Sequence, residues 1–224
     1  MNTPIKFAIL AADTVLFAIK DRMLMVRLNR IDRPPYFVNI KGLPGGLLGA
    51  HETATEAALR HLKEKTGIQA RALYAEQLYT FSGVDRDPRG RVVAVTYLAL
   101  VPWESLSEAE QEGNDESAWI RVADVAKLAY DHNEVLDVAL ARLRSRVAYT
   151  TLIAKLLPQE FTLTELEEAY ECILGKDIDK RNFRKKIEKL DLLAPLERFR
   201  EGTRFRPARL YKFRSKEVNE IEIL

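Results

Sequence analysis

The chain has 224 residues, of which 47% are hydrophobic and 30% charged, and this is the composition of a globular protein with a substantial core. The length fits two domains of ordinary size. The net charge of +2 identifies neither a nucleic-acid-binding nor a membrane-bound protein by itself. A single cysteine, Cys172, excludes an internal disulfide framework and fits a reducing, cytoplasmic location. No apolar stretch reaches the length of a membrane span, so no membrane partner is expected.

The first two thirds of the chain alternate strand and helix patterns. Strands are predicted within residues 5–28, with a turn near 20–22, and the proline pair in 31–39 predicts a loop. A glycine-rich turn then precedes a helix that ends at Gly67, and Thr53 with Glu56 forms the sequence of a capping box at its start. The remaining elements predicted in this part are strands near 71–82, 92–101 and 118–122, loops at 84–91 and 105–117, and an amphipathic helix over 132–146.

After Tyr149 the pattern changes. Three short helices are predicted over 150–158, 161–174 and 179–193, and a hairpin over 196–214. We therefore predict two domains, covering residues 1–147 and 148–224.

Residues 44–67, PGGLLGAHETATEAALRHLKEKTG, resemble the Nudix box, G-x5-E-x7-R-E-U-x-E-E-x-G-U, where U is apolar. Counted from Gly46, the residues at their expected positions are Glu52, Arg60, Leu62, Glu64, Gly67 and Ile68. His61 and Lys65 replace the two remaining glutamates of the pattern. The resemblance implies a Nudix fold of α/β (α+β) class for the first domain.

The replacements at positions 61 and 65 affect the binding of a catalytic metal ion. Residues 61, 64 and 65 share one helix face, where three carboxylates would hold divalent cations that bridge phosphate oxygens. Here the face carries His61, Glu64 and Lys65, and a lysine ammonium repels such a cation. Glu52, His61, Glu64 and Lys65 are therefore expected to form a degenerate catalytic set that holds no metal, with hydrolysis weak or absent.

Two interpretations of Lys65 remain open. Its ammonium either replaces the missing metal beside a pyrophosphate, or is solvated or paired with Glu64. His61 would serve as a ligand of a transition metal only if other ligands joined it, and a lone histidine is more often not a ligand.

Other candidate ligand-binding residues surround the box. The loop VDRDPRGR supplies Arg86, Arg89 and Arg91, whose guanidinium groups suit phosphate and ribose, although a charged hairpin loop is the simpler interpretation. Arg27 ends a strand ahead of the glycine turn and is a further phosphate-facing candidate. The candidate ligand-binding set is Arg27, Gly45, Gly46, Lys65, Arg86, Arg89 and Arg91.

The second domain hides a strong positive charge. Residues 180–214 contain thirteen Lys or Arg against four acidic residues, so this segment carries +9 and the rest of the chain about −7. A patch of this kind is typical of proteins that bind a phosphate backbone. Asp179 is placed to cap a helix in which Phe183, Ile187 and Leu190 face a core, leaving Arg181 and Lys185 on the opposite side.

This arrangement predicts a winged helix-turn-helix. A helix starting at Thr162 or Thr164 precedes the basic helix, and the following hairpin has Glu201 and Gly202 at its tip. The predicted DNA-contacting residues are Thr162, Thr164, Lys180, Arg181, Asn182, Arg184, Lys185, Lys189, Arg204, Arg206 and Arg209. Any single arginine here is equally well explained as a solvated surface charge. An RNA-binding module is the less favoured alternative, because A-form RNA hides its major groove from side chains.

A Nudix-like domain followed by a mostly α winged helix resembles the Nudix-related transcriptional regulators, bacterial controllers of NAD metabolism. The resemblance extends to the segments PRGRVV, DHNEVLDVALARLRSR, RNFRKKIEKLDLL and RPARLY. It implies a cytoplasmic, nucleoid-associated homodimer that acts as a repressor and binds a palindromic double-stranded operator. It also implies ADP-ribose or a related phosphorylated nucleotide as effector, and no required cofactor. The alternatives are a sugar-responsive regulator of the same architecture and an active ADP-ribose pyrophosphatase.

Overall fold

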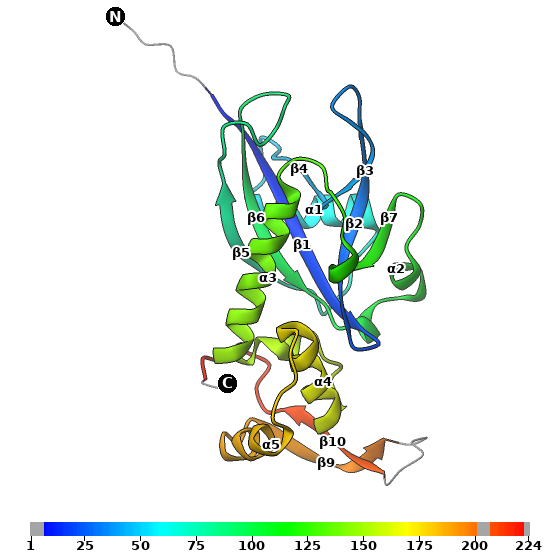
Figure 1. Cartoon of the computed structure of the whole chain (residues 1–224), viewed down its shortest axis with the longest axis vertical. Helices are drawn as coiled ribbons and strands as arrows, with labels where there is room; N and C mark the ends of the chain where they lie inside the picture. The colour runs from blue at the N-terminus through cyan, green and yellow to red at the C-terminus, as the bar shows by residue number, and fades with distance from the viewer. Residues whose placement is uncertain (1–6, 201–206, 222–224) are drawn as a thin grey trace, which may run out of the picture.

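A computed structural model of the chain describes residues 7–200 and 207–221. Figure 1 shows two parts joined by the long helix α3 (His132–Tyr149): a mixed sheet with helices on both faces, and a smaller part that carries α5 and a β-hairpin at the end remote from the N-terminus.

The first part is built on a mixed sheet. Its central strand order is β3-β2-β1-β6-β5, in which β1 and β6 run parallel and the other neighbours antiparallel. Two short strands lie off this path, with β4 paired to β1 and β7 paired to β2. The strands are β1 (Ile9–Lys20), β2 (Met23–Arg33), β3 (Phe37–Gly42), β4 (Gly45–Leu47), β5 (Tyr74–Phe81), β6 (Val92–Leu100) and β7 (Ser117–Arg121).

Both faces of β1 are covered by helices. Val15 and Phe17 belong to the core cluster on the α3 side, whereas Leu16 and Ala18 belong to the cluster that includes Leu62 of α1 (Ala54–Thr66). Successive strand side chains point to opposite faces, so burial on both faces explains the continuous apolar run of this strand.

Helix α1 forms where the sequence predicts it. Thr53 and Glu56 make the predicted capping box, and Gly67 ends the helix in the left-handed conformation with φ of 74°. These caps fix the ends of the helix that carries the box residues.

The second part shares its core with the first. Leu143 and Val147 of α3 belong to one buried cluster with Phe17 of β1 and with Leu152 and Tyr170 of the second part. The predicted domain boundary at 147 therefore falls inside α3 and stays a prediction. The elements of this part are the 3-10 helix η3 (Thr151–Lys155), β8 (Phe161–Thr162), α4 (Leu163–Leu174), α5 (Lys180–Lys189), β9 (Leu193–Arg200) and β10 (Ala208–Phe213).

Three local predictions are corrected. The loop predicted for 31–39 is a tight turn, because β2 continues to Arg33 and pairs there with Phe37 of β3. The predicted acidic loop follows the 3-10 helix η1 (Trp103–Ser105) and contains the helix α2 (Glu108–Glu112), which starts because Ser107 and Glu110 form a capping box. The helix predicted over 150–158 is only the short η3.

Two other predicted features lie partly outside the described residues, namely the start of the first strand at 5–6 and the wing tip with Glu201, Gly202, Arg204 and Arg206. The helix predicted to end at 146 continues to Tyr149, and the 3-10 helix η2 (Val122–Asp124) follows β7. No helix in the described part of the chain combines the length and the apolar character that crossing a membrane requires.

Candidate functional site

A cleft of about 550 Å³ opens where two pairs of strands diverge. The first half of β1 pairs with β4 at Ala11–Asp13, whereas β2 pairs with β1 only at Phe17–Lys20 and then turns to β3. The space between them is closed by α1 and the loop 84–91. The predicted ligand-binding and degenerate catalytic residues that line this cleft are Gly45, Gly46, His61, Glu64, Lys65, Arg86 and Arg89.

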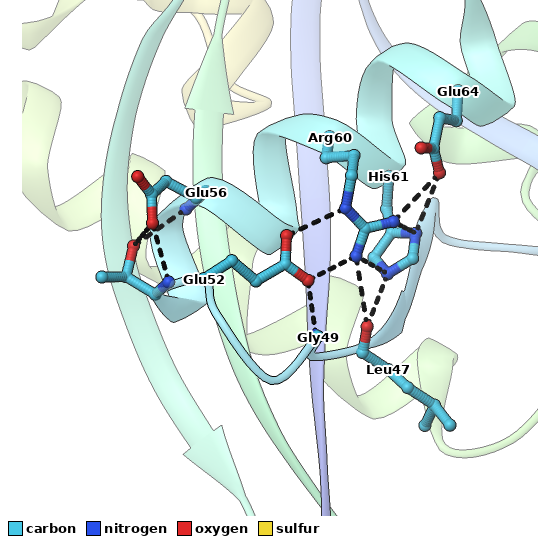
Figure 2. Close-up of polar contacts among 8 residues, drawn as sticks. Leu47, Gly49, Glu52, Glu56, Arg60, His61 and Glu64 are labelled. Carbon is cyan, nitrogen blue, oxygen red and sulfur yellow. Dashed lines mark hydrogen bonds and ion pairs between the residues drawn. The ribbon is translucent and has the colours of Figure 1, made fainter.

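Both acidic residues that the box retains are bound by Arg60 (Figure 2). The guanidinium donates to both carboxylate oxygens of Glu52, at 2.5 and 2.9 Å, and to Oε2 of Glu64 at 3.1 Å. The backbone N–H of Gly49 also donates to Glu52, at 2.5 Å. The hydrogen bond from Arg60 lowers the pKa of Glu52 to about 2, with the Gly49 bond acting in the same direction. Glu52 thus braces the loop ahead of α1.

His61 is fixed in the cleft wall. Its Nε2 lies 2.9 Å from the carbonyl oxygen of Leu47, and Figure 2 shows the ring between this oxygen and Glu64. Because a carbonyl can only accept, Nε2 carries a proton, and Nδ1 lies 3.3 Å from the Arg60 guanidinium. A Cβ added at Gly46 would lie 2.5 Å from the His61 ring, so a larger residue there would require the ring to move.

The box residues do not fit the divalent cation that the Nudix pattern implies. Glu52 and Glu64 are engaged by Arg60, Nδ1 of His61 faces a guanidinium, and Lys65 brings a positive charge to the third position. Throughout residues 7–200 and 207–221, no group of three or more His, Cys, Asp or Glu side chains is arranged to hold a metal ion.

A buried polar network that the sequence reasoning missed lies under the cleft. Arg86 donates two hydrogen bonds to Asp131, at 2.7 and 2.8 Å, and its Nη2 lies 3.5 Å from Oδ2 of Asp13. His132 accepts a hydrogen bond from the backbone N–H of Leu43 at 2.9 Å, so its proton is on Nε2, which lies 4.0 Å from Asp13. The network ties β1, the loop 84–91 and the start of α3 together.

Burial sets the charge states in this network. Burial raises the pKa of Asp13 to about 6, although the positive charge of Arg86 opposes the shift. Burial lowers the pKa of His132 to about 3, so the imidazole is neutral at pH 7. The sequence did carry one signal for the network, because Asp13 interrupts an otherwise apolar strand.

Arg89 and an aromatic group form another wall. Arg89 is paired with Asp87 at 2.7 Å, and its guanidinium lies 5.5 Å from the ring centroid of Tyr130. Tyr130 in turn packs on Phe37, with ring centroids 4.4 Å apart. The cleft therefore presents a cation stacked on an aromatic face.

The structure does not bring Arg27 or Arg91 to the cleft, which corrects both predictions. Arg27 is buried and donates to Ser117 Oγ at 2.9 Å and to the carbonyl oxygen of Thr66 at 3.2 Å. Its side chain points to the α1 side of the sheet, where it joins α1 to β7. Arg91 donates to the carbonyl oxygens of Ser82 and Gly83, both at 2.9 Å.

The second candidate site is the outer face of α5. Asp179 caps the helix as predicted, since its side chain accepts a hydrogen bond from the Asn182 N–H at 3.0 Å, and Phe183 and Ile187 are buried. Five cations of α5 are exposed, and four of them form no ion pair within the described part of the chain: Lys180, Arg181, Lys185 and Lys189. Asn182 is also exposed, and its side-chain amide donates to Asp179 at 2.8 Å.

Several of the predicted DNA-contacting residues make contacts within the chain. Arg184 pairs with Glu167, whose side chain is fully buried, and so holds α5 against α4. Thr162 is buried as the N-cap of α4, whereas Thr164 is exposed. Arg209 donates across the hairpin to Leu196 and Glu197. Arg204 and Arg206 lie outside the described residues.

Comparison with known proteins finds a separate match for the part that holds the cleft and for the part that holds α5. Residues 8–142 match the NUDIX domain, and residues 153–213 match the NrtR DNA-binding winged helix domain. The chain is 32% identical to the ADPR responsive transcriptional repressor NtrR of Acinetobacter baylyi, over 92% of this chain and 82% of the relative. It also superposes on Shewanella oneidensis NrtR complexed with a 27mer DNA, with a TM-score of 0.80, 35% identity, and coverage of 92% of this chain and 93% of the other.

The chain belongs to the NrtR family. The predicted resemblance and fold class, a Nudix fold followed by a winged helix domain, are thereby confirmed. The Nudix part is also similar to the NUDIX domain of Shewanella oneidensis NrtR complexed with ADP ribose, with a TM-score of 0.53, 34% identity, and coverage of 62% of this chain and 90% of the other.

Proposed function

We propose that this NrtR-family chain is an ADP-ribose-responsive transcriptional repressor, which holds operator DNA through the winged helix domain and releases it when the cleft binds ADP-ribose. The observation that carries the proposal is the presence of two separate sites, the cleft and the exposed cations of α5, on parts that share one core through α3. The relatives support it, since the Acinetobacter baylyi protein is an ADPR responsive repressor and Shewanella oneidensis NrtR was crystallised with a 27mer DNA.

The face of α5 is suited to a major groove. Its unpaired cations attract the phosphate backbone, and an arginine such as Arg181 can donate two hydrogen bonds to a guanine edge. In the proposed complex two copies bind a palindrome, with half-sites about 34 Å apart so that both α5 helices face the same side of the duplex. Thr164 and the wing contact the phosphate backbone of the DNA.

The cleft binds the effector without efficient hydrolysis in this proposal, and no metal or other cofactor is required. The support is the misfit between the box residues and a divalent cation. Without a metal to activate water and stabilise charge on the leaving phosphate, an arrangement of this kind retains binding and loses most of the catalysis. Weak residual turnover remains compatible with a regulator.

The coupling runs through the start of α3. Asp131 and His132 begin this helix, and both are held by cleft residues, Asp131 by Arg86 and His132 by the Leu43 N–H. An effector that draws Arg86 or the loop 84–91 toward its phosphates shifts the start of α3, and α3 continues into the core of the winged helix domain. The effector must favour one arrangement in free energy for operator affinity to change.

The test is a gel shift with an operator selected from random duplexes, titrated with ADP-ribose, AMP, ribose 5-phosphate and arabinose. We expect ADP-ribose at millimolar concentration to release the DNA and the other three to have no effect. Release by arabinose alone would identify a sugar-responsive regulator. Rapid ADP-ribose cleavage with magnesium or manganese, without any duplex binding, would identify a hydrolase instead.

A further inference from the structure

The charges that line the cleft are mostly neutralised by neighbours. Arg30 pairs with Glu116, Arg86 with Asp131 and Arg89 with Asp87. These pairs fix the shape of the wall and leave little net charge for a ligand.

Lys65 and Arg33 are different. Within the described residues neither forms an ion pair with a carboxylate, and the only hydrogen bond that the Arg33 side chain donates there goes to the backbone oxygen of Asp32, at 3.1 Å. Lys65 is half-buried at the C-terminal end of α1, whereas Arg33 is at the end of β2, so two separate elements bring these charges to one cleft.

The charge of Arg33 acts on Lys65, which lines the same cleft. Burial lowers the pKa of Lys65, and the positive charges of Arg33 and Arg89 lower it further, while Asp13 and Glu64 oppose the change. Like charges at one cleft repel one another, and an anion bound between them would offset that repulsion.

We propose that Lys65 and Arg33 form a diphosphate site that works without metal, in which the Lys65 ammonium occupies the electrostatic role of the divalent cation. This inference deepens the proposed function and rests on it for the identity of the complete ligand. The lysine supplies a point charge, and Arg33 supplies planar donors for phosphate oxygens. The retained Nudix helix thus holds a diphosphate and cannot activate water against it.

A buried acceptor in the same cleft fits the sugar that adjoins such a diphosphate. Asn29 is 5% exposed, its amide donates to the backbone oxygen of Arg30 at 2.9 Å, and its Oδ1 has no hydrogen-bond partner within the described residues. A buried acceptor without a partner costs free energy, which a ribose hydroxyl would recover by donating to it. The ligand class is therefore a diphosphate joined to a sugar.

The experiment is calorimetric titration of the full chain with ADP-ribose and with inorganic pyrophosphate, each in EDTA and in magnesium. We expect both probes to bind in EDTA, and magnesium to leave the affinity for ADP-ribose unchanged. Lys65→Met and Arg33→Gln should each weaken binding of both probes about tenfold or more, as for loss of a charge-assisted hydrogen bond. Lys65→Arg should retain most of the affinity.

Lys63→Met is the matched control, because Lys63 is on the same helix but is exposed and does not line the cleft. Its affinity should equal that of the parent chain, and thermal melting of every variant verifies folding. The double variant His61→Glu/Lys65→Glu restores the acidic face, so it should bind Mn²⁺ alone and lose pyrophosphate binding in EDTA.

The outcomes separate this inference from the proposed function. Metal-free pyrophosphate binding that depends on Lys65, without ADP-ribose binding, would support the diphosphate site and reject the effector. Binding of either probe only with magnesium, binding of neither, or a Lys65→Met variant with full affinity would overturn the site.

Discussion

The two cationic regions of this NrtR-family chain differ in how their charges are paired. In the cleft, Arg30, Arg86 and Arg89 each have a carboxylate partner, and Lys65 and Arg33 are the exceptions among the described residues. On α5 the pattern is reversed, since the exposed cations are unpaired and Arg184 is the exception.

The difference separates two ways of binding an anion. Paired arginines are held rigidly, so a small ligand meets a preformed site and its binding is transmitted through the partners. Unpaired cations on a helix surface adapt to a long polyanion and supply affinity that depends on salt. The exceptions are informative, because Lys65 and Arg33 are free to hold a ligand and Arg184 is committed to the fold.

The largest effect should come from removing the unpaired cations of α5. Arg181→Ala together with Lys185→Ala should weaken operator binding about 100-fold or more, because base and phosphate contacts are each worth roughly 1–3 kcal/mol. Fluorescence anisotropy with labelled operator measures the loss, and calorimetry should find ADP-ribose affinity unchanged. Lys63→Ala with Arg71→Ala removes the same charge far from α5 and is the control. Intact operator binding by the α5 variant would reject α5 as the reading helix.

Removing Arg184, the paired cation of α5, should mainly lower the free energy of unfolding. Arg184→Ala leaves the carboxylate of Glu167 buried without its partner, and such a change costs about 2 kcal/mol here, below the range for fully buried pairs because the Arg184 side chain is 49% exposed. Urea unfolding measures the loss. Adding Glu167→Gln should recover part of it, whereas an unchanged unfolding free energy in Arg184→Ala would show that the pair is not structural.

The packing of His61 against Gly46 gives a third test. Gly46→Ala should destabilise the chain by about 1–3 kcal/mol, because the added methyl group would overlap the imidazole ring. The double variant Gly46→Ala/His61→Ala removes the obstacle, so its loss should be smaller than the sum of the single losses. Additive losses in thermal melting would contradict the packing of these residues.

The smallest expected effect is a change in pH dependence. Since the pKa of His132 is lowered to about 3, the folded state binds fewer protons there than the unfolded state, and stability falls as pH decreases from about 6.5 to about 3. Since the pKa of Asp13 is raised to about 6, Asp13 acts oppositely and adds stability as pH decreases from about 6 to about 4.

Asp13→Asn removes the opposing contribution, so the variant should lose stability more steeply than the parent chain between pH 6 and 4 in urea titrations. Asp85→Asn, an exposed residue of the neighbouring loop, is the control and should keep the parent slope. A shallower slope in Asp13→Asn would mean that Asp13 is not held in an environment that favours its neutral form.

The sequence was most informative where local rules act alone. The capping box at Thr53, the left-handed Gly67 and the amphipathic α5 are short-range features, and the structure has each as predicted. The two-domain fold followed from the spacing of the box and from the basic helix.

The sequence was least informative where a partner is distant along the chain. Arg27 and Arg184 have the same chemistry as a phosphate-binding arginine, and only the positions of Thr66 and Glu167 show that both belong to the fold. The network under the cleft brings Asp13 close to Asp131 and His132, which are more than a hundred residues later in the chain. No local sequence pattern predicts that these side chains lie together.

The central claim is that effector binding in the cleft and operator binding by α5 are coupled in free energy. The direct measurement is operator affinity with and without saturating ADP-ribose in EDTA, together with ADP-ribose affinity with and without operator. Coupling predicts that both affinities weaken by the same factor, at least several-fold, with ADP-ribose recovered intact. If ADP-ribose binds but neither affinity changes in the presence of the other ligand, the account is contradicted.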